Sequence, residues 1–249
     1  SYGGGRTRYT YDAAGNIRSI EDEKGNVTSF TYDGMGNVLT LEGPENGTFR
    51  YTYDAVGNLL AEESARGTVT YTYDQMGRVS AVTDEEGYTT TYTYDALGRC
   101  ICVTDPLGAE TEYTYDDRCG EVSRIRDGEG GETTFAYTAN GWLEEIGYAD
   151  GTKASCRYDS LGQLTAVTEP SGRTIDYTYD AAGNVITQED SLGQIYRYRY
   201  DGLGNVTEMT RPDGRRETYA YDSRGLLSSY TDAQGAVTAY SYTADGWLE

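Results

Sequence analysis

Histidine is absent from this chain of 249 residues, and several other residue types are scarce. There are 3 Phe, 3 Met and 4 Pro, and Lys and Arg together number 20 against 41 Asp and Glu. The missing histidine removes the commonest general base, the Ser-His and Cys-His nucleophile pairs and most catalytic zinc sites. Any enzymatic chemistry would therefore have to depend on carboxylates.

The excess of acid gives a formal net charge of −21 and a pI of about 4.3. Nucleic acids and anionic membrane surfaces attract Lys and Arg, so we exclude both as partners. No run of about 18 apolar residues is present to cross a bilayer, and we expect no membrane insertion. The four Cys are irregularly placed, which favours free thiols over a disulfide framework or a zinc site.

What the sequence has in abundance is a repeat of about 21 residues, marked by one recurrent tyrosine. From it we predict a single repeat array over residues 1–249, and expect it to be excised from a longer polypeptide, because the last copy stops two residues into an expected strand. The twelve marker tyrosines are at positions 11, 32, 53, 73, 94, 115, 137, 158, 179, 200, 221 and 242.

Each marker tyrosine belongs to a predicted strand that ends in a turn. An aromatic residue precedes it by two positions in eleven of twelve copies, and this spacing puts both rings on one face of a strand. Asp follows the tyrosine in ten copies, and Gly usually comes three residues later. The Asp side chain can accept hydrogen bonds from amides two or three residues on, while Gly adopts the left-handed conformation that closes a hairpin with a bulge.

These residues are predicted to have structural roles. The clearest examples are Tyr11, Asp12, Gly15, Tyr32, Asp33, Gly36, Tyr53, Asp54, Gly57, Tyr94, Asp95, Gly98, Tyr179, Asp180 and Gly183. A second Asp-x-x-Gly turn lies about ten residues further on, as at Asp105 to Gly108, so each repeat is a hairpin of two strands. The recurrent carboxylates are thus explained by turns, and we predict no catalytic, cofactor-binding or metal-binding residues and no enzymatic activity.

The first strand of each repeat begins with an apolar residue, and another usually follows three positions later, as at Ile17 and Ile20. A gap of three is not strict alternation. It indicates a bulge, a strong twist or partial burial of both faces.

The predicted fold is all-β, built from about 12 tandem antiparallel hairpins. Roughly 24 strands spaced about 4.8 Å apart would make a ribbon on the order of 115 Å wide. Open sheets rarely exceed about ten strands without curling or splitting, so we expect a hollow shell segment that either spirals or closes on itself.

The string from Tyr94 to Asp116, YDALGRCICVTDPLGAETEYTYD, closely resembles the YD repeat of the RHS family, and this resemblance covers essentially the whole chain. Members include bacterial RHS and wall-associated proteins, the cocoon-forming subunits of toxin complexes, and the teneurins. The resemblance implies a hollow β-shell that encloses a C-terminal toxic domain in the bacterial toxins and takes part in extracellular adhesion in teneurins. No toxin, protease or ligand-binding segment is recognisable beyond the repeats.

Our leading hypothesis is a structural shell segment whose parent protein is extracellular or on the cell surface. Its expected partners are enclosed cargo, neighbouring domains of the parent and other copies that pair through exposed edge strands. The alternative is an adhesion module that binds glycans or proteins through the Tyr-rich face, with Trp142 and Trp247 as candidate glycan contacts. The acidic loop Asp127 to Glu132 raises calcium binding as a lesser alternative, since it lacks the pattern of known calcium loops.

Overall fold

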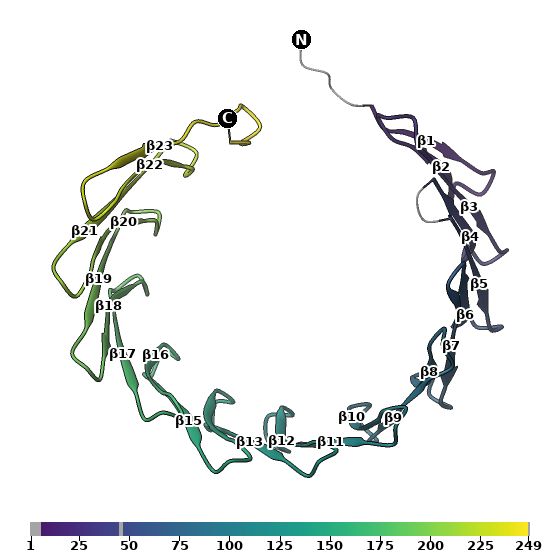
Figure 1. Ribbon diagram of the computed structural model, residues 1–249, viewed down its shortest axis with the longest axis horizontal. Coiled ribbons are helices and arrows are strands. Elements are labelled where there is room, and N and C mark those ends of the chain that lie inside the picture. The colour runs from purple at the N-terminus through teal and green to yellow at the C-terminus, as the bar shows by residue number, and fades with distance from the viewer. Residues whose placement is uncertain (1–5, 45–46, 249) are drawn as a thin grey trace. The chain divides into compact units, whose positions relative to one another are not determined.

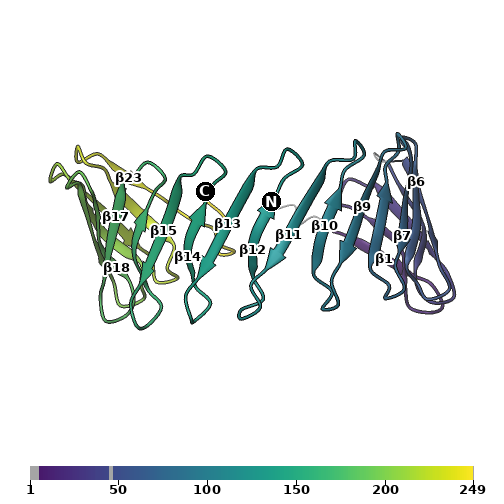
Figure 2. The same cartoon turned by 90° about the horizontal axis from the view of Figure 1, so that it is seen from below.

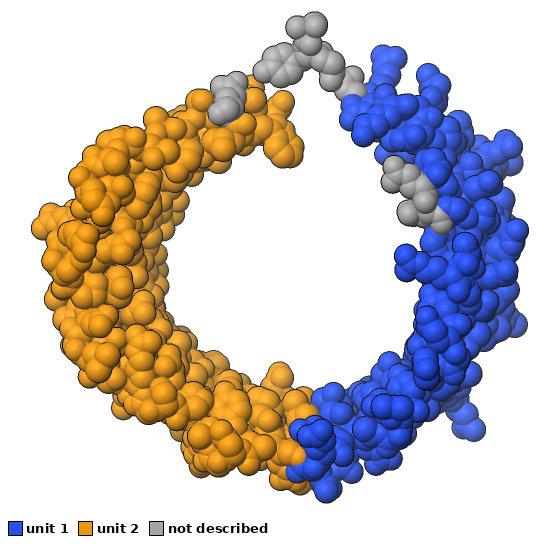
Figure 3. Space-filling view, viewed as in Figure 1, with its two compact units in different colours: residues 1–114, 126–130 blue, residues 115–125, 131–249 orange. Residues whose placement is uncertain are grey.

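The computed structural model describes residues 6–44 and 47–248. Across these residues the chain forms 23 β-strands and no helix, which confirms the all-β prediction. The chain divides into two compact units, Ser1–Thr114 with Arg126–Gly130, and Tyr115–Ile125 with Gly131–Glu249 (Figure 3). Both units are built from the same hairpin repeat.

Unit 1 is an antiparallel meander in which each strand pairs with the next one along the chain (Figure 1). Its strands are β1 (Arg8–Tyr11), β2 (Ile17–Glu21), β3 (Val27–Tyr32), β4 (Val38–Gly43), β5 (Gly47–Tyr53), β6 (Leu59–Ser64), β7 (Gly67–Tyr73), β8 (Val79–Thr83), β9 (Thr89–Tyr94), β10 (Cys100–Thr104) and β11 (Glu110–Tyr115), whose last residue falls in unit 2.

Unit 2 repeats the same arrangement, with consecutive antiparallel pairing from β13 to β23. Figure 2 shows the hairpin turns at both ends of the strands. The strands are β12 (Val122–Arg126), β13 (Glu132–Tyr137), β14 (Leu143–Gly147), β15 (Lys153–Tyr158), β16 (Leu164–Thr168), β17 (Thr174–Tyr179), β18 (Val185–Asp190), β19 (Ile195–Tyr200), β20 (Val206–Thr210), β21 (Arg216–Tyr221), β22 (Leu227–Thr231) and β23 (Val237–Ala239).

A β-bulge at the start of each first strand explains the apolar gap of three. In the first repeat Tyr9 pairs with Ile20 and Tyr11 pairs with Ile17, while the register shifts between Thr10 and Tyr11. The extra residue in β2 brings Ile17 and Ile20 to the same face as the two tyrosines. The same shift recurs in the later hairpins, so the bulge is the correct one of the three interpretations.

The two faces of each sheet differ in chemistry. We call the face that carries the marker tyrosines and their apolar partners the aromatic face. The opposite face presents small and polar residues, and there the hydroxyls of Thr10 and Ser19, and those of Thr31 and Thr40, are 2.6 Å apart. Such cross-strand hydroxyl pairs contribute to sheet stability.

Neither unit has a conventional hydrophobic core. Ala166, 2% exposed, is the buried apolar residue in the described part of the chain, and most other side chains of the aromatic face are half-buried. A single sheet layer cannot enclose side chains on both sides. Stability must therefore come from contacts between neighbouring strands and repeats, as in other repeat proteins.

Candidate functional site

The feature repeated most regularly along the chain is the junction between successive hairpins, and it begins with the first turn of each repeat. In the first copy the Asp12 amide donates to the Asn16 carbonyl at 2.9 Å, and the Gly15 amide donates back to the Asp12 carbonyl at 3.2 Å. Gly15 has a φ of 90°, in the left-handed region that favours glycine. The turn is therefore a type I turn closed by a glycine bulge.

The Asp carboxylate secures this turn with three hydrogen bonds. Oδ1 of Asp12 accepts from the amides of Ala14 and Asn16, both at 2.9 Å, and Oδ2 accepts from Nδ2 of Asn16 at 3.1 Å. The amides are two and four residues on, where the sequence pattern led us to expect two or three. These bonds, the Asn16 side chain first, lower the pKa of Asp12.

The other predicted turn residues have the same geometry. Asp33, Asp54 and Asp180 each accept from two amides and an asparagine side chain, and Asp95 accepts from two amides and the Arg99 guanidinium. The glycines that close these turns all have positive φ: Gly36 (90°), Gly57 (94°), Gly98 (85°) and Gly183 (90°).

The marker tyrosine bonds to the preceding hairpin through its hydroxyl group. The Tyr32 hydroxyl donates to the Ile17 carbonyl at 2.8 Å, fifteen residues back. Strands β2 and β3 pair only from Ser19 to Glu21, so Ile17 lies beyond the end of their ladder. The tyrosine therefore extends the pairing between two hairpins past the point where the backbone ladder stops.

This tyrosine–carbonyl bond recurs in both units. Tyr53, Tyr94 and Tyr179 donate to the carbonyls of Val38, Val79 and Leu164 at 2.9, 2.7 and 2.6 Å, and six more copies make the equivalent bond: Tyr73, Tyr137, Tyr158, Tyr200, Tyr221 and Tyr242. Tyr11, in the first copy, is 59% exposed. Partial burial raises the pKa of the Tyr53, Tyr94 and Tyr179 hydroxyls, so they remain donors at neutral pH.

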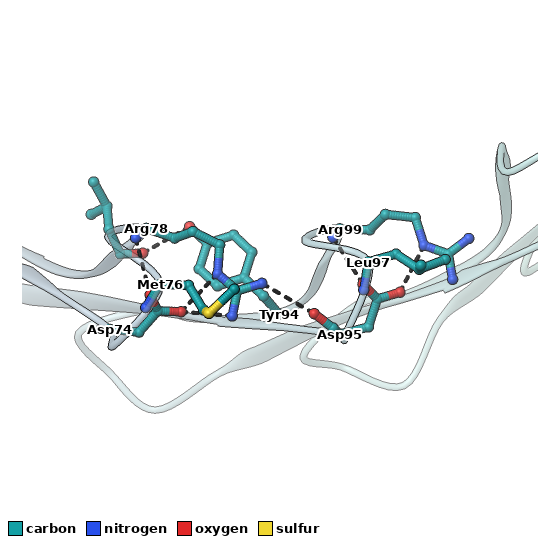
Figure 4. A network of polar contacts seen from close by, with 8 residues as sticks. Asp74, Met76, Arg78, Tyr94, Asp95, Leu97 and Arg99 are labelled. Carbon is teal, nitrogen blue, oxygen red and sulfur yellow. Dashed lines mark hydrogen bonds and ion pairs between the residues drawn. The ribbon is translucent and has the colours of Figure 1, made fainter.

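Arginine strengthens one of these junctions (Figure 4). Nε of Arg78 donates to Oδ2 of Asp74 in its own turn at 2.7 Å, and Nη1 donates to the Asp95 carbonyl of the next turn at 3.1 Å. The same guanidinium lies 4.6 Å from the centre of the Tyr94 ring. Arg78 thus joins its own turn to both recurrent elements of the next repeat, the tyrosine and the turn aspartate.

The two tryptophans, which we singled out as candidate glycan contacts, lie in different surroundings. Both follow a turn in which Thr replaces Asp, and the amides of Trp142 and Trp247 donate to the hydroxyls of Thr138 and Thr243 at 3.1 Å. The Trp142 ring packs against the Tyr158 ring, with centroids 5.3 Å apart, and over Gly162. Trp247 is 75% exposed.

Sequence reasoning missed a buried carboxylate on the aromatic face of unit 2 that pairs with a partly exposed arginine. The Glu217 side chain is 5% exposed and accepts from the Arg211 guanidinium and from the Tyr219 hydroxyl. Burial raises the pKa of Glu217, but its hydrogen bonds outweigh that effect and the net direction is downward, while burial and this contact raise the pKa of Tyr219 to about 12. One sequence feature could have indicated this ion pair. Glu217, which pairs with Met209, occupies a position at which the other repeats carry apolar residues or Thr.

No group of three or more His, Cys, Asp or Glu in the described residues could hold a metal ion. Within the same residues, no helix has the length and apolar character to cross a membrane. Cys100 pairs with Tyr94 and Cys102 with Thr93, on either side of the bulge, so their side chains are on opposite faces and neither forms a disulfide.

Hairpins with these turns and tyrosine bonds define a YD-repeat β-sheet protein. The family model of the teneurin YD-shell matches residues 2–119 and 62–211, and that of the RHS repeat matches residues 221–249. The chain therefore belongs to the teneurin YD-shell family, which confirms the resemblance noted in the sequence. No curated protein matches the chain.

The fold is shared with solved structures, among them the two that follow. A crystal structure of TcdB2-TccC3-TEV is 18% identical with a TM-score of 0.72, covering 96% of this chain and 16% of that chain. The Tc holotoxin pore of Photorhabdus luminescens is 17% identical with a TM-score of 0.60, covering 98% of this chain and 19% of that chain. This chain thus spans less than a fifth of either of those chains.

Proposed function

We propose that the chain is a non-enzymatic segment of a β-shell wall that acts outside the cell or on its surface. In its parent protein the wall would enclose cargo, such as a C-terminal toxin, or display neighbouring domains. The observation that carries this proposal is the repetition of one junction, the tyrosine–carbonyl bond with its Asp-x-x-Gly turn, through both units.

The way in which the polar side chains are used along the repeats supports a structural role without catalysis. The turn carboxylates are engaged by backbone amides and by Asn or Arg side chains, so they serve the fold. An enzyme site concentrates unusual chemistry at one place, whereas here successive repeats place similar groups in similar geometry. Membership of a shell family and the fold shared with a Tc holotoxin component agree with this role.

Limited proteolysis of the complete gene product tests enclosure. We expect any segment encoded together with the array to be cleaved much more slowly than the same segment expressed alone. Destabilising the array by replacing several marker tyrosines with Phe should abolish this protection. Equal cleavage rates in the presence and absence of an intact array would contradict the proposal.

Glycan binding remains the alternative, and the exposure of Trp247 is the observation that favours it. Saturable binding on a glycan array that is lost in Trp247→Ala would establish this function. Trp142→Ala is the matched control, because the Trp142 ring is packed against Tyr158. The wall proposal predicts no saturable ligand in either case.

A further inference from the structure

Unit 1 carries a row of exposed apolar side chains that the hairpin fold does not use. Met35, Val56, Met76 and Leu97 occupy the third position of four successive first turns and are 66%, 76%, 79% and 78% exposed. We call these four residues the apolar rim. Since two strands separate neighbouring turns, the side chains recur about every 10 Å along one margin of the sheet.

The turn itself does not require an apolar residue at this position. Each rim residue contributes its backbone amide to the turn, as when Met35 donates to Oδ1 of Asp33 at 2.8 Å. Ala14, Arg118 and Arg224 make the same amide bond from the equivalent position. The apolar side chains are therefore additional to the fold, and their regular recurrence along one margin is the feature that points to an interaction surface.

The turn positions beside the apolar rim also carry no charged residue, although 24% of the residues of the chain are charged. The two central positions of the first five first turns hold only Ala, Gly, Val, Met, Leu and Gln. The carboxylates that flank them are occupied, Asp54 by Asn58 and Asp74 by Arg78.

The opposite margin of unit 1, formed by the second turns, differs sharply. Its central positions include four acidic residues, Glu23, Glu85, Glu86 and Glu129, and two basic ones, Lys24 and Arg66. One of its turns also carries the exposed Leu107. This margin therefore carries charge of both signs with an acidic excess, whereas the central positions of the first five first turns carry none.

We propose that two copies of this chain associate through their apolar rims, related by a two-fold axis. A second copy is the occupant that fits, because it presents apolar side chains at the same spacing of about 10 Å and no charged residue at the central positions of the facing turns. Four side chains from each copy bury on the order of 1,000 Å² in total, at the lower limit for a specific interface. The association is therefore reversible and weak.

Sedimentation velocity over a series of concentrations tests this interface. The wild-type chain should show a reversible monomer–dimer equilibrium. The double variant Val56→Glu/Met76→Glu, which places like charges at the centre of the interface, should raise the Kd at least tenfold. Glutamate fits this turn position, since Glu86 occupies its equivalent in a second turn, and circular dichroism of the variant verifies folding.

Leu107→Glu is the matched control, because Leu107 is 90% exposed at the same position of a second turn, on the opposite margin. It should leave the Kd unchanged. A strictly monomeric wild-type chain would overturn the proposal. So would association that persists in the rim variant, which would point instead to pairing of edge strands, and so would an equal loss in Leu107→Glu.

Discussion

The two turns of many hairpins share the Asp-x-x-Gly motif but differ in how they contact the neighbouring repeats. A Cβ added to the first-turn glycines Gly57 or Gly98 would lie 3.7 or 3.8 Å from the side chains of Asn37 or Arg78, one repeat back. At the second-turn glycines Gly87, Gly108 and Gly172 it would meet nothing within 4 Å. At these positions a first turn lies against the residue that follows the preceding first turn. Second turns contact their neighbours through other residues, since Glu85 lies against Gly67 and Arg173 pairs with Asp190 at 2.9 Å.

The first turns lie at the end of the sheet where the tyrosine–carbonyl bonds are made. In the first junction, backbone pairing of Ser19 to Glu21 in β2 with β3 joins the two hairpins at the second-turn end. The Tyr32 hydroxyl bond joins them at the first-turn end. The comparison shows that neighbouring hairpins are joined by backbone pairing at one margin and by a tyrosine hydroxyl bond at the other. The following predictions test that difference.

The largest difference in the free energy of unfolding is expected between the variants Gly162→Ala and Gly172→Ala. Both glycines have nearly the same φ, 85° and 84°, so alanine suffers the same backbone strain of about 1 to 2 kcal/mol. At Gly162 the new Cβ would also lie 2.6 Å from the Trp142 ring. Urea denaturation should show a loss of about 2 to 4 kcal/mol for Gly162→Ala, clearly more than for Gly172→Ala. Equal losses would mean that the Trp142 contact is not part of the junction.

Removing one tyrosine hydroxyl should have an intermediate effect. Tyr94→Phe keeps the ring beside Arg78 but leaves the Val79 carbonyl without this donor, and we expect a loss of about 1 kcal/mol in the free energy of unfolding. The control is Tyr88→Phe, near a second turn, where the side chain is 57% exposed. Its unfolding free energy should be unchanged, and a comparable loss there would argue against a specific role for the Tyr94 bond.

The fold was largely predictable from the sequence, whereas the junction was not. The period of about 21 residues, the strand alternation and the turn glycines are local signals, and they predicted the hairpins. The acceptor of the Tyr32 hydroxyl is fifteen residues away and becomes evident only when the limited length of the β2–β3 ladder is known. The packing of Trp142 over Gly162 and the pairing of Arg211 with Glu217 likewise depend on strand register.

The smallest difference in thermal stability is expected between variants that replace the aspartate of a first turn and that of a second turn. Asp54 accepts from two amides and from Asn58, whereas at Asp84 the two amide bonds come from Glu86 and Tyr88. At pH 7 each of the variants Asp54→Asn and Asp84→Asn should lower the Tm by at most about 1 to 2 °C. The loss should be larger for Asp54→Asn.

The effect at Asp54 should also depend on pH. The Asn58 side chain and amide lower the pKa of Asp54 in the folded chain, so its contribution is fully present above the unfolded pKa of about 4 and is lost as pH falls through the folded value. The difference in Tm between wild type and Asp54→Asn should therefore narrow below pH 4. A difference that stayed constant down to pH 2 would contradict this role of the carboxylate.

The most direct test of the central claim, that tyrosine–carbonyl bonds between repeats hold first turns more firmly than second turns, is native-state hydrogen exchange of equivalent turn amides. The Gly57 and Gly87 amides make the same bond to the carbonyl of their own turn aspartate, at 3.2 and 3.1 Å. If first turns are held by neighbouring repeats, the Gly57 and Asn58 amides should exchange more slowly than those of Gly87 and Tyr88. Equal rates, or faster exchange at Gly57 and Asn58, would contradict the account.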